Sequence, residues 1–423
     1  MTRSVLPSRL HRGALLGAVA LAALAVAAPA GAAFAIGAGP VCPQATAYRG
    51  IDLVPSSALS EVDARAVASV SVGSLPPGVT LTGNTFSGTP TTAGMTTFTL
   101  TVQKEDVPAE SMVCMMTVKT APTPTRIQGV DRYDQAAKVS ASQFTMGSNL
   151  VYVASGEKFA DALSAGSVAG VQGAPLLLTQ AGALPASTRA ELTRLSPDDI
   201  VVVGGAASVS EAVVADLTAS FGDATVTRVW GADRYAGSRA LIADPMFGVP
   251  VATEVYVAAG NTFPDALAAS PAAIAVNGPV LLVDGTATAA TPAEIGLLTD
   301  LGTTTVRIAG GPLTVSQGIQ DSLGADLFSV TRASGPDRYS GAVAVNQAFT
   351  TASTFYLASG EVFPDALSAA PVAGEQGAPV YLVQKHCVPK PVLQEIVRLE
   401  PTKIVILGGD ATLSSQVDML KPC

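Results

Sequence analysis

Histidine and charge are scarce in this 423-residue sequence, and both shortages restrict its chemistry. Only two histidines occur, His11 and His386, and charged residues make up 13%, against about 25% in ordinary globular proteins. His11 falls in the leader described below, so one imidazole remains. This excludes histidine-rich zinc sites and any His-dependent triad repeated in several domains. Hydrophobic residues make up 48%, which excludes disorder as the main state.

Long apolar runs and basic faces are also missing. Beyond the first 35 residues, no stretch offers the roughly 20 consecutive apolar residues of a membrane-spanning helix. The formal net charge is −9, and because phosphate recognition needs a basic face, this acid excess argues against nucleic acid binding. Neither a G-x-G-x-x-G nor a Walker pattern is present. We therefore expect no nucleotide site, no other cofactor and no metal.

A secretory signal peptide is predicted over residues 1–35. Arg3, Arg9 and Arg12 precede an apolar run of 15 residues, and small-residue cleavage sites follow at 28–30 and 33–35. The run is short for a membrane-spanning helix, so cleavage is favoured over retention as an anchor. Cleavage removes three arginines and no acid, which makes the exported chain still more acidic.

The four cysteines, in an exported chain, favour disulfides over thiol catalysis. Three pairings are possible, and we favour Cys42–Cys114 and Cys387–Cys423, because each pair brackets one segment and neither crosses the proline-rich linker at 120–125. Metal binding is the alternative, but no pair shows the two-residue spacing of zinc sites. The last residues, Leu420 to Cys423, contain no hydrophobic tail and no sorting pentapeptide, so we expect any surface retention to be non-covalent.

Internal repetition dominates the sequence after the linker. The pattern T-R-x-x-G-x-D-R-Y begins at Thr125, Thr227 and Thr331, a period of about 100 residues. A second signature, A-x-G-x-x-F-x-D-A-L, follows in each copy, and its aspartate is residue 161, 265 or 365. From that aspartate to the proline before the next strand is 14 residues in every copy. Such agreement of several spacings excludes coincidence.

Each block alternates apolar strands with helices. The strands at 151–154, 175–179 and 200–203 are apolar almost throughout, and helical stretches separate them. This alternation indicates parallel sheets covered on both faces, so we interpret each block as a small, doubly wound, Rossmann-like α/β unit. A glycine pair closes the last strand of each block. Ser208 with Glu211, and Thr314 with Gln317, match capping boxes of the next helix.

Residues 41–120 have a different character. L-P-P-G and G-T-P turns alternate with period-two strands such as 97–102, which predicts an antiparallel β-sandwich. This segment resembles the immunoglobulin-like modules of bacterial surface proteins.

The three blocks resemble the cell wall binding repeat type 2 family. The resemblance rests on T-R-x-x-G-x-D-R-Y, A-S-G-x-x-F-P-D-A-L-S, G-A-P-L-L-L and I-V-V-V-G-G, and it covers about 300 of the 423 residues. It implies three tandem modules packed in a triangular, pseudo-threefold arrangement that attach a protein non-covalently to anionic polymers of the Gram-positive cell wall. The expected organisation is an immunoglobulin-like module at 41–120 and wall-binding repeats at 125–226, 227–330 and 331–423.

Fourteen residues are candidate ligand-binding residues. Arginine grips carboxylate or phosphate through paired hydrogen bonds, aspartate and serine recur beside it, and backbone N–H groups of glycine pairs at strand ends can meet an anion. The candidates are Arg132, Arg234, Arg338, Asp161, Asp265, Asp365, Ser155, Ser359, Gly204, Gly205, Gly310, Gly311, Gly408 and Gly409.

Structural roles compete with each of these assignments. The arginines are alternatively paired with Asp131, Asp161 or their counterparts, and Asp161, Asp265 and Asp365 alternatively complement helix N-termini. The glycine pairs also suit tight turns. Ser155 and Ser359 have no G-x-S-x-G context, and no histidine repeats beside them. A carboxylate pair such as Glu157 with Asp161 has no counterpart in the middle copy, where Asn261 replaces the glutamate, so we predict no catalytic residue.

We therefore expect a secreted, non-catalytic protein of the wall surface whose repeats bind an anionic wall polymer or peptidoglycan. The rival hypothesis is a peptidoglycan amidase, or an accessory that modifies one, and a third is an adhesin that acts through the β-module. An acidic protein that binds an acidic polymer must rely on local arginine clusters or bridging cations, because the Debye length is only about 8 Å at physiological salt.

Overall fold

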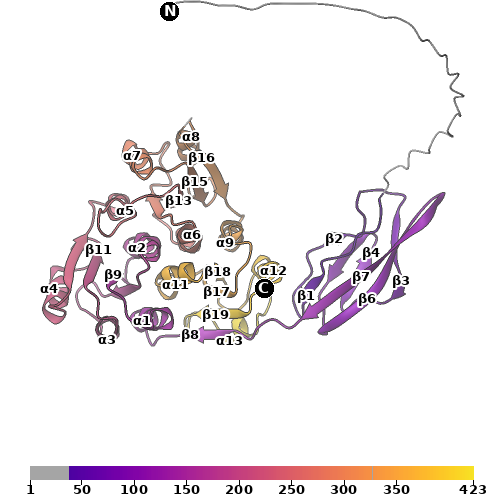
Figure 1. The fold of residues 1–423 in the computed structure, drawn as a ribbon, viewed down its shortest axis with the longest axis horizontal. Helices are drawn as coiled ribbons and strands as arrows, with labels where there is room; N and C mark the ends of the chain where they lie inside the picture. Colours follow the sequence, from indigo (N-terminus) through magenta and orange to yellow (C-terminus); the bar gives the residue numbers. More distant parts are fainter. Residues whose placement is uncertain (1–37, 326) are drawn as a thin grey trace, which may run out of the picture.

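The computed structural model describes residues 38–325 and 327–423. The predicted signal peptide lies outside the described residues. A β-module comes first, and three α/β repeats follow it in a ring (Figure 1). This is the predicted fold class. None of the helices in the described ranges is both long and apolar enough to cross a bilayer.

The β-module consists of two facing sheets. Alternation of buried and exposed residues along its strands builds the core; Phe98, Leu100 and Val102, for example, are buried at every second position. One sheet has the order β1-β7-β6-β3 and the other β2-β5-β4. The strands are β1 (Thr46–Tyr48), β2 (Ser56–Ser57), β3 (Val67–Gly73), β4 (Val79–Thr82), β5 (Thr85–Gly88), β6 (Gly94–Lys104) and β7 (Val107–Lys119). Because β1 runs parallel to β7, the module is not the wholly antiparallel sandwich that the sequence predicts.

Both predicted disulfides are present. Cys42–Cys114 ties the segment before β1 to β7, with 5.4 Å between the Cα atoms. Cys387–Cys423 ties the C-terminal residue to the loop after β18, with a Cα separation of 5.0 Å. Each bridge therefore lies within a single unit, the first in the β-module and the second in the third repeat.

The three repeats contain parallel sheets with helices on both faces. The first is formed by α1 (Arg132–Gln143), β9 (Leu150–Ser155), α2 (Phe159–Val171), β10 (Leu176–Thr179), α3 (Ala186–Leu195), β11 (Asp199–Val203) and α4 (Glu211–Ser220). The second contains α5 (Arg234–Ile242), β13 (Glu254–Ala259), α6 (Pro264–Ile274), β14 (Val280–Val283), α7 (Pro292–Asp300), β15 (Thr305–Ala309) and α8 (Gln317–Gly324). The third contains α9 (Arg338–Asn346), β17 (Thr354–Ser359), α10 (Pro364–Leu367), α11 (Ala369–Glu375), β18 (Val380–Val383), α12 (Lys390–Leu399), β19 (Lys403–Leu407) and α13 (Ser415–Asp418).

Each sheet takes its fourth strand from outside its own block. The T-R segments form β8 (Thr125–Ile127), β12 (Thr225–Val229) and β16 (Ser329–Ala333). Strand β12 pairs with β11 of the first repeat, and β16 pairs with β15 of the second. Strand β8, which enters from the linker, pairs with β19 of the third repeat and so closes the ring. The sequence pattern alone did not predict this exchange.

The arginine of each T-R segment holds the exchanged strand in place. Arg126 donates to the carbonyl oxygens of Gly408 and Leu413, at 2.8 and 2.9 Å, and to Asp418 at 2.7 Å. Arg228 and Arg332 donate in the same way to the carbonyls of Gly204 and Gly310. These side chains fasten each block to its neighbour through charge-assisted hydrogen bonds.

Helices α2, α6 and α11 pack against one another at the centre of the ring (Figure 1). Glycines in α2 and α11 let Ile274 of α6 enter this contact. A Cβ on Gly374 would stand 2.6 Å from the Cβ of Ile274, and a Cβ on Gly170 would overlap the same side chain. One hydrophobic core therefore runs through all three repeats.

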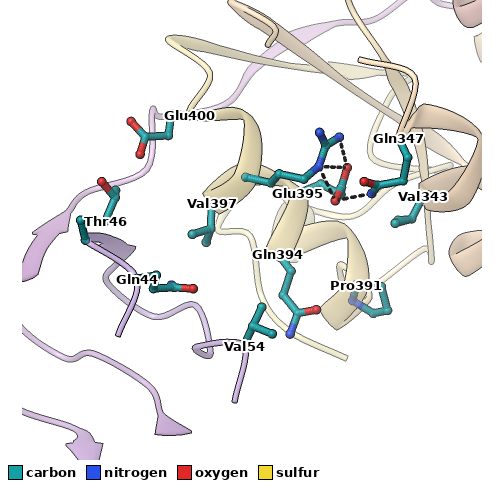
Figure 2. A pocket seen from close by; sticks show the side chains of 12 residues that line it. Gln44, Thr46, Val54, Val343, Gln347, Pro391, Gln394, Glu395, Val397 and Glu400 are labelled. Carbon is teal, nitrogen blue, oxygen red and sulfur yellow. Dashed lines mark hydrogen bonds and ion pairs between the residues drawn. The ribbon is translucent and has the colours of Figure 1, made fainter. Parts of the chain in front are cut away.

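The β-module is docked on the third repeat. Tyr48 and Ile51 are buried in the core of the ring, and ion pairs Lys119–Glu400 and Lys390–Asp52 join the two units at 2.7 and 2.8 Å. A crevice of about 650 Å³ lies between β1 and α12 (Figure 2). Its one buried carboxylate, Glu395, is held by Arg398 and by Gln347.

The central glycine contact gives a stability prediction. Gly374→Ala should lower the free energy of unfolding by about 1–3 kcal/mol, because the new methyl group collides with Ile274 in a filled core. Gly296→Ala, in helix α7 with nothing near the new methyl group, should instead raise it by about 0.5–1 kcal/mol through helix propensity. Urea unfolding of both variants measures the two effects. Equal stabilisation by both substitutions would contradict this packing.

Candidate functional site

Three grooves lie where neighbouring repeats meet, at the carboxyl ends of the sheet strands. Each groove is lined by the second signature of one repeat and the D-R-Y segment of the next. Their volumes are about 450 Å³ between repeats 1 and 2, about 430 Å³ between repeats 2 and 3, and about 620 Å³ between repeats 3 and 1. We call them groove 1–2, groove 2–3 and groove 3–1. The pairs that line them are Asp161 with Arg234, Asp265 with Arg338, and Asp365 with Arg132.

The D-R-Y aspartate begins a helix, and this places the arginine. Asp131, Asp233 and Asp337 are N-caps whose side chains accept backbone N–H bonds in the first turns of α1, α5 and α9. The capped turn therefore holds the arginine that follows each aspartate at the groove.

Each of these arginines donates to a glycine carbonyl of its own repeat. Arg132 Nη1 lies 2.6 Å from the oxygen of Gly156, and the matching distances for Arg234 and Arg338 are 2.7 Å to Gly260 and 2.5 Å to Gly360. The alternative partners Asp131 and Asp161 are not used: none of the ion pairs in residues 38–325 and 327–423 involves these three arginines. Their remaining N–H groups can therefore receive an anion.

Three phenylalanines of the second signature meet at the centre of the site. The ring centroids of Phe159, Phe263 and Phe363 lie 5.5 to 6.1 Å apart in tilted and edge-on arrangements. Two groove arginines also contact them: Arg234 lies 5.8 Å from the Phe159 ring centroid and Arg338 5.9 Å from that of Phe263. Members of this cluster line groove 3–1 and groove 1–2. The phenylalanine recurs in every copy of the second signature, but the sequence analysis did not predict that the three rings meet.

The second-signature aspartates are buried against the strand ends. Asp161, Asp265 and Asp365 lie in the first turns of α2, α6 and α10. Burial raises the pKa of each carboxyl above its ordinary value, whereas a hydrogen bond from Ser208, Thr314 or Thr412 opposes the rise. The prediction that Ser208 and Thr314 are N-caps is therefore wrong. Ser210 and Ser316 cap α4 and α8 instead.

The first glycine of each pair is required by the buried aspartate. Gly204, Gly310 and Gly408 have φ near +110°, and a Cβ on any of them would overlap the aspartate carboxylate. Their N–H groups donate to Val229, Ala333 and Ile127 across the exchanged strands, so they do not face an anion. The second glycines, Gly205, Gly311 and Gly409, line the grooves.

Ser155 and Ser359 lie behind the grooves. Both are buried, and each hydroxyl accepts backbone N–H bonds from the two residues that follow the glycine, at 3.1 to 3.3 Å. They shape the turn after the strand. His386 is in an exposed loop, 3.1 Å from the hydroxyl of Ser414. Within the described ranges, no three His, Cys, Asp or Glu side chains gather as metal ligands.

The ring of three α/β repeats, with a groove at each junction between repeats, defines a class of modular repeat protein. The chain belongs to the cell wall binding domain 2 (CWB2) family, whose pattern matches residues 126–214, 228–320 and 332–418. The three matches correspond to the three repeats of the ring.

Two solved structures share the fold. Cwp6 from Clostridium difficile is 20% identical, with a TM-score of 0.65. The match covers 89% of this chain and 67% of the Cwp6 chain. Cwp8 from the same organism is 23% identical, with a TM-score of 0.61. The match covers 78% of this chain and 59% of the Cwp8 chain.

Two curated relatives come from Bacillus subtilis (strain 168). The N-acetylmuramoyl-L-alanine amidase LytC is 27% identical over 293 residues, which is 69% of this chain and 56% of the relative. An amidase enhancer is 29% identical over 296 residues, or 69% of this chain and 39% of the relative. The chain thus spans about half the length, or less, of these proteins.

The buried aspartates give a pH prediction. Because the folded-state pKa of each is raised, the folded protein retains protons that the unfolded chain has released, so these groups lower stability as the pH rises above 3.8. Replacing all three with asparagine should make the variant increasingly more stable, relative to wild type, between acidic and neutral pH.

Urea unfolding over that pH range tests this, with Asp216→Asn as the control. Hydrogen bonds from Arg189 and Ser220 lower the pKa of Asp216, so its replacement should have the opposite pH dependence. A stability difference between the triple variant and wild type that does not change with pH would refute the assignment.

Proposed function

We propose that the chain attaches non-covalently to the cell wall by binding an anionic wall polymer in the three grooves, and that it has no catalytic activity. The observation that carries the proposal is the repeated arginine. Arg132, Arg234 and Arg338 each line a groove, are held by a glycine carbonyl, and form no ion pair with any carboxylate in the part of the chain that the structure describes. Family membership supports the wall as the place of binding.

Three equivalent grooves suit a repetitive ligand. A polymer that engages a second groove does so at the effective concentration set by the short distance between grooves, so weak sites add up to firm retention. The acidic chain opposes the approach of an anion at long range, but screening confines this repulsion to about 8 Å at physiological salt. Retention should therefore weaken with added salt and depend on divalent cations that bridge the two acidic partners.

Sedimentation with purified sacculi tests the arginines. Replacing Arg132, Arg234 and Arg338 together with glutamine should reduce retention more than tenfold, because each lost charged hydrogen bond is worth about 1.5–3 kcal/mol. The matched control replaces Arg49, Arg65 and Arg189, three arginines outside the grooves. A lysine triple variant, which keeps the charge but not the planar fork, should retain part of the binding.

The same sacculi stripped of their anionic polymer complete the test. Wild-type protein should no longer sediment with them. Equal retention before and after removal of the polymer, or an unaffected triple glutamine variant that melts like wild type, would overturn the anionic-ligand proposal.

The second candidate function is that of a peptidoglycan amidase or its accessory. The names of the two curated relatives favour it, whereas the structural roles of Ser155, Ser359 and the buried aspartates oppose it. We expect no release of reducing ends or free amines when the protein is incubated with sacculi, and no change in the rate of an added amidase. Release that an Asp161→Asn or Asp365→Asn variant abolishes would establish the enzyme instead.

A further inference from the structure

The chain's single tryptophan lies exposed at the rim of one groove. Trp230 directly follows β12 and has 57% of its surface exposed, although tryptophan side chains are usually largely buried. The equivalent residues after β8 and β16 are Gln128 and Ser334. Only groove 1–2 therefore has a large aromatic side chain at this position.

The backbone that carries Trp230 is held firmly. Its neighbour Val229 is paired with Val203 in the sheet and accepts the N–H of Gly204 at 2.9 Å. The Cε3 atom of the indole lies 3.6 Å from the position that a Cβ on Gly205 would occupy. Because Gly205 and Gly231 both line groove 1–2, the indole stands directly beside the groove.

The same groove also has a second cation. Lys158 lines it together with Arg234, and its ammonium group donates to the carbonyl of Ala207 at 2.9 Å. The equivalent positions in the other repeats are Thr262 and Val362. Among the described residues, groove 1–2 thus combines an exposed indole with two cationic side chains, beside the carboxylates of Glu157, Asp161 and Asp233, whereas groove 2–3 and groove 3–1 are each lined by one arginine.

We propose that Trp230 is a stacking platform for a pyranose ring of an anionic glycan, with Lys158 and Arg234 receiving its acidic substituents. The C–H face of a sugar ring is apolar and suits the flat indole, whose rigid side chain loses little entropy on binding. An anionic polymer whose backbone has no rings would use the arginines but not the indole. This inference rests on the proposed function, and it makes groove 1–2 the dominant binding site.

Fluorescence excited at wavelengths that tyrosine barely absorbs reports on this site alone, because Trp230 is the only tryptophan among the chain's aromatic residues. We would titrate the full exported chain with the anionic polymer extracted from sacculi and record the emission. The expected result is a saturating change in intensity or wavelength. Inorganic polyphosphate, a polyanion without rings, should leave the emission unchanged at concentrations where it competes for the arginines.

Calorimetry of matched variants measures how much Trp230 contributes to the affinity for the polymer. Trp230→Ala should weaken binding of the extracted polymer about tenfold or more, as expected when an aromatic stacking contact is lost, whereas Trp230→Phe should stay within about threefold of wild type. The control variants Gln128→Ala and Ser334→Ala, at the equivalent positions, should change it less than about twofold. Because Trp230 is exposed, all of these variants should melt at the wild-type temperature.

The outcomes separate the two proposals. If wild-type protein is retained by sacculi but its emission does not respond to the polymer, or if Trp230→Ala binds like wild type, the stacking role is wrong and wall attachment stands. If wild-type protein is not retained at all, the proposed function itself fails. A polymer that changes the emission equally in a Lys158→Gln, Arg234→Gln variant would show stacking without charge recognition and would overturn the anionic part of the inference.

Discussion

No repeat of this protein completes its own sheet, and the rest of the structure depends on this constraint. Three strands come from one block and the fourth from the block that follows, while β8 closes the third sheet from the start of the ring. The exchange leaves each repeat with an open sheet edge unless its neighbour is present. It therefore makes the three repeats one cooperative unit with a shared core, and it places the carboxyl end of every sheet beside the first helix of the next repeat.

The grooves are a direct result of this arrangement. An aspartate from one repeat faces an arginine from the next, and neither block alone contains a complete groove. Burial raises the pKa of this aspartate, and the hydroxyl group that hydrogen-bonds to it opposes the rise. The arginine is oriented by a neutral backbone carbonyl of its own repeat. Each junction thus brings an arginine and carboxylates together in one groove.

The β-module packs directly on the ring. Its edge strand β1 rests against α12, two ion pairs join it to the third repeat, and Tyr48 and Ile51 extend the core of the ring. Its linker continues directly as the closing strand β8. The module is thus displayed in a defined orientation to the grooves.

The sequence by itself determined the repeats, the α/β class, the disulfide pairs and the residue types of the site, because these depend on local periodicity and spacing. Only the tertiary structure decided which blocks share a strand, that the grooves lie between repeats, and that Asp161 meets Gly204 and Ser208. A repeated motif has the same appearance whether its strand pairs within its own block or with the preceding one. The local pattern also placed the helix N-caps two residues early, left anion binding and carboxylate pairing open as alternatives for the arginines, and did not predict the meeting of three phenylalanines at the centre.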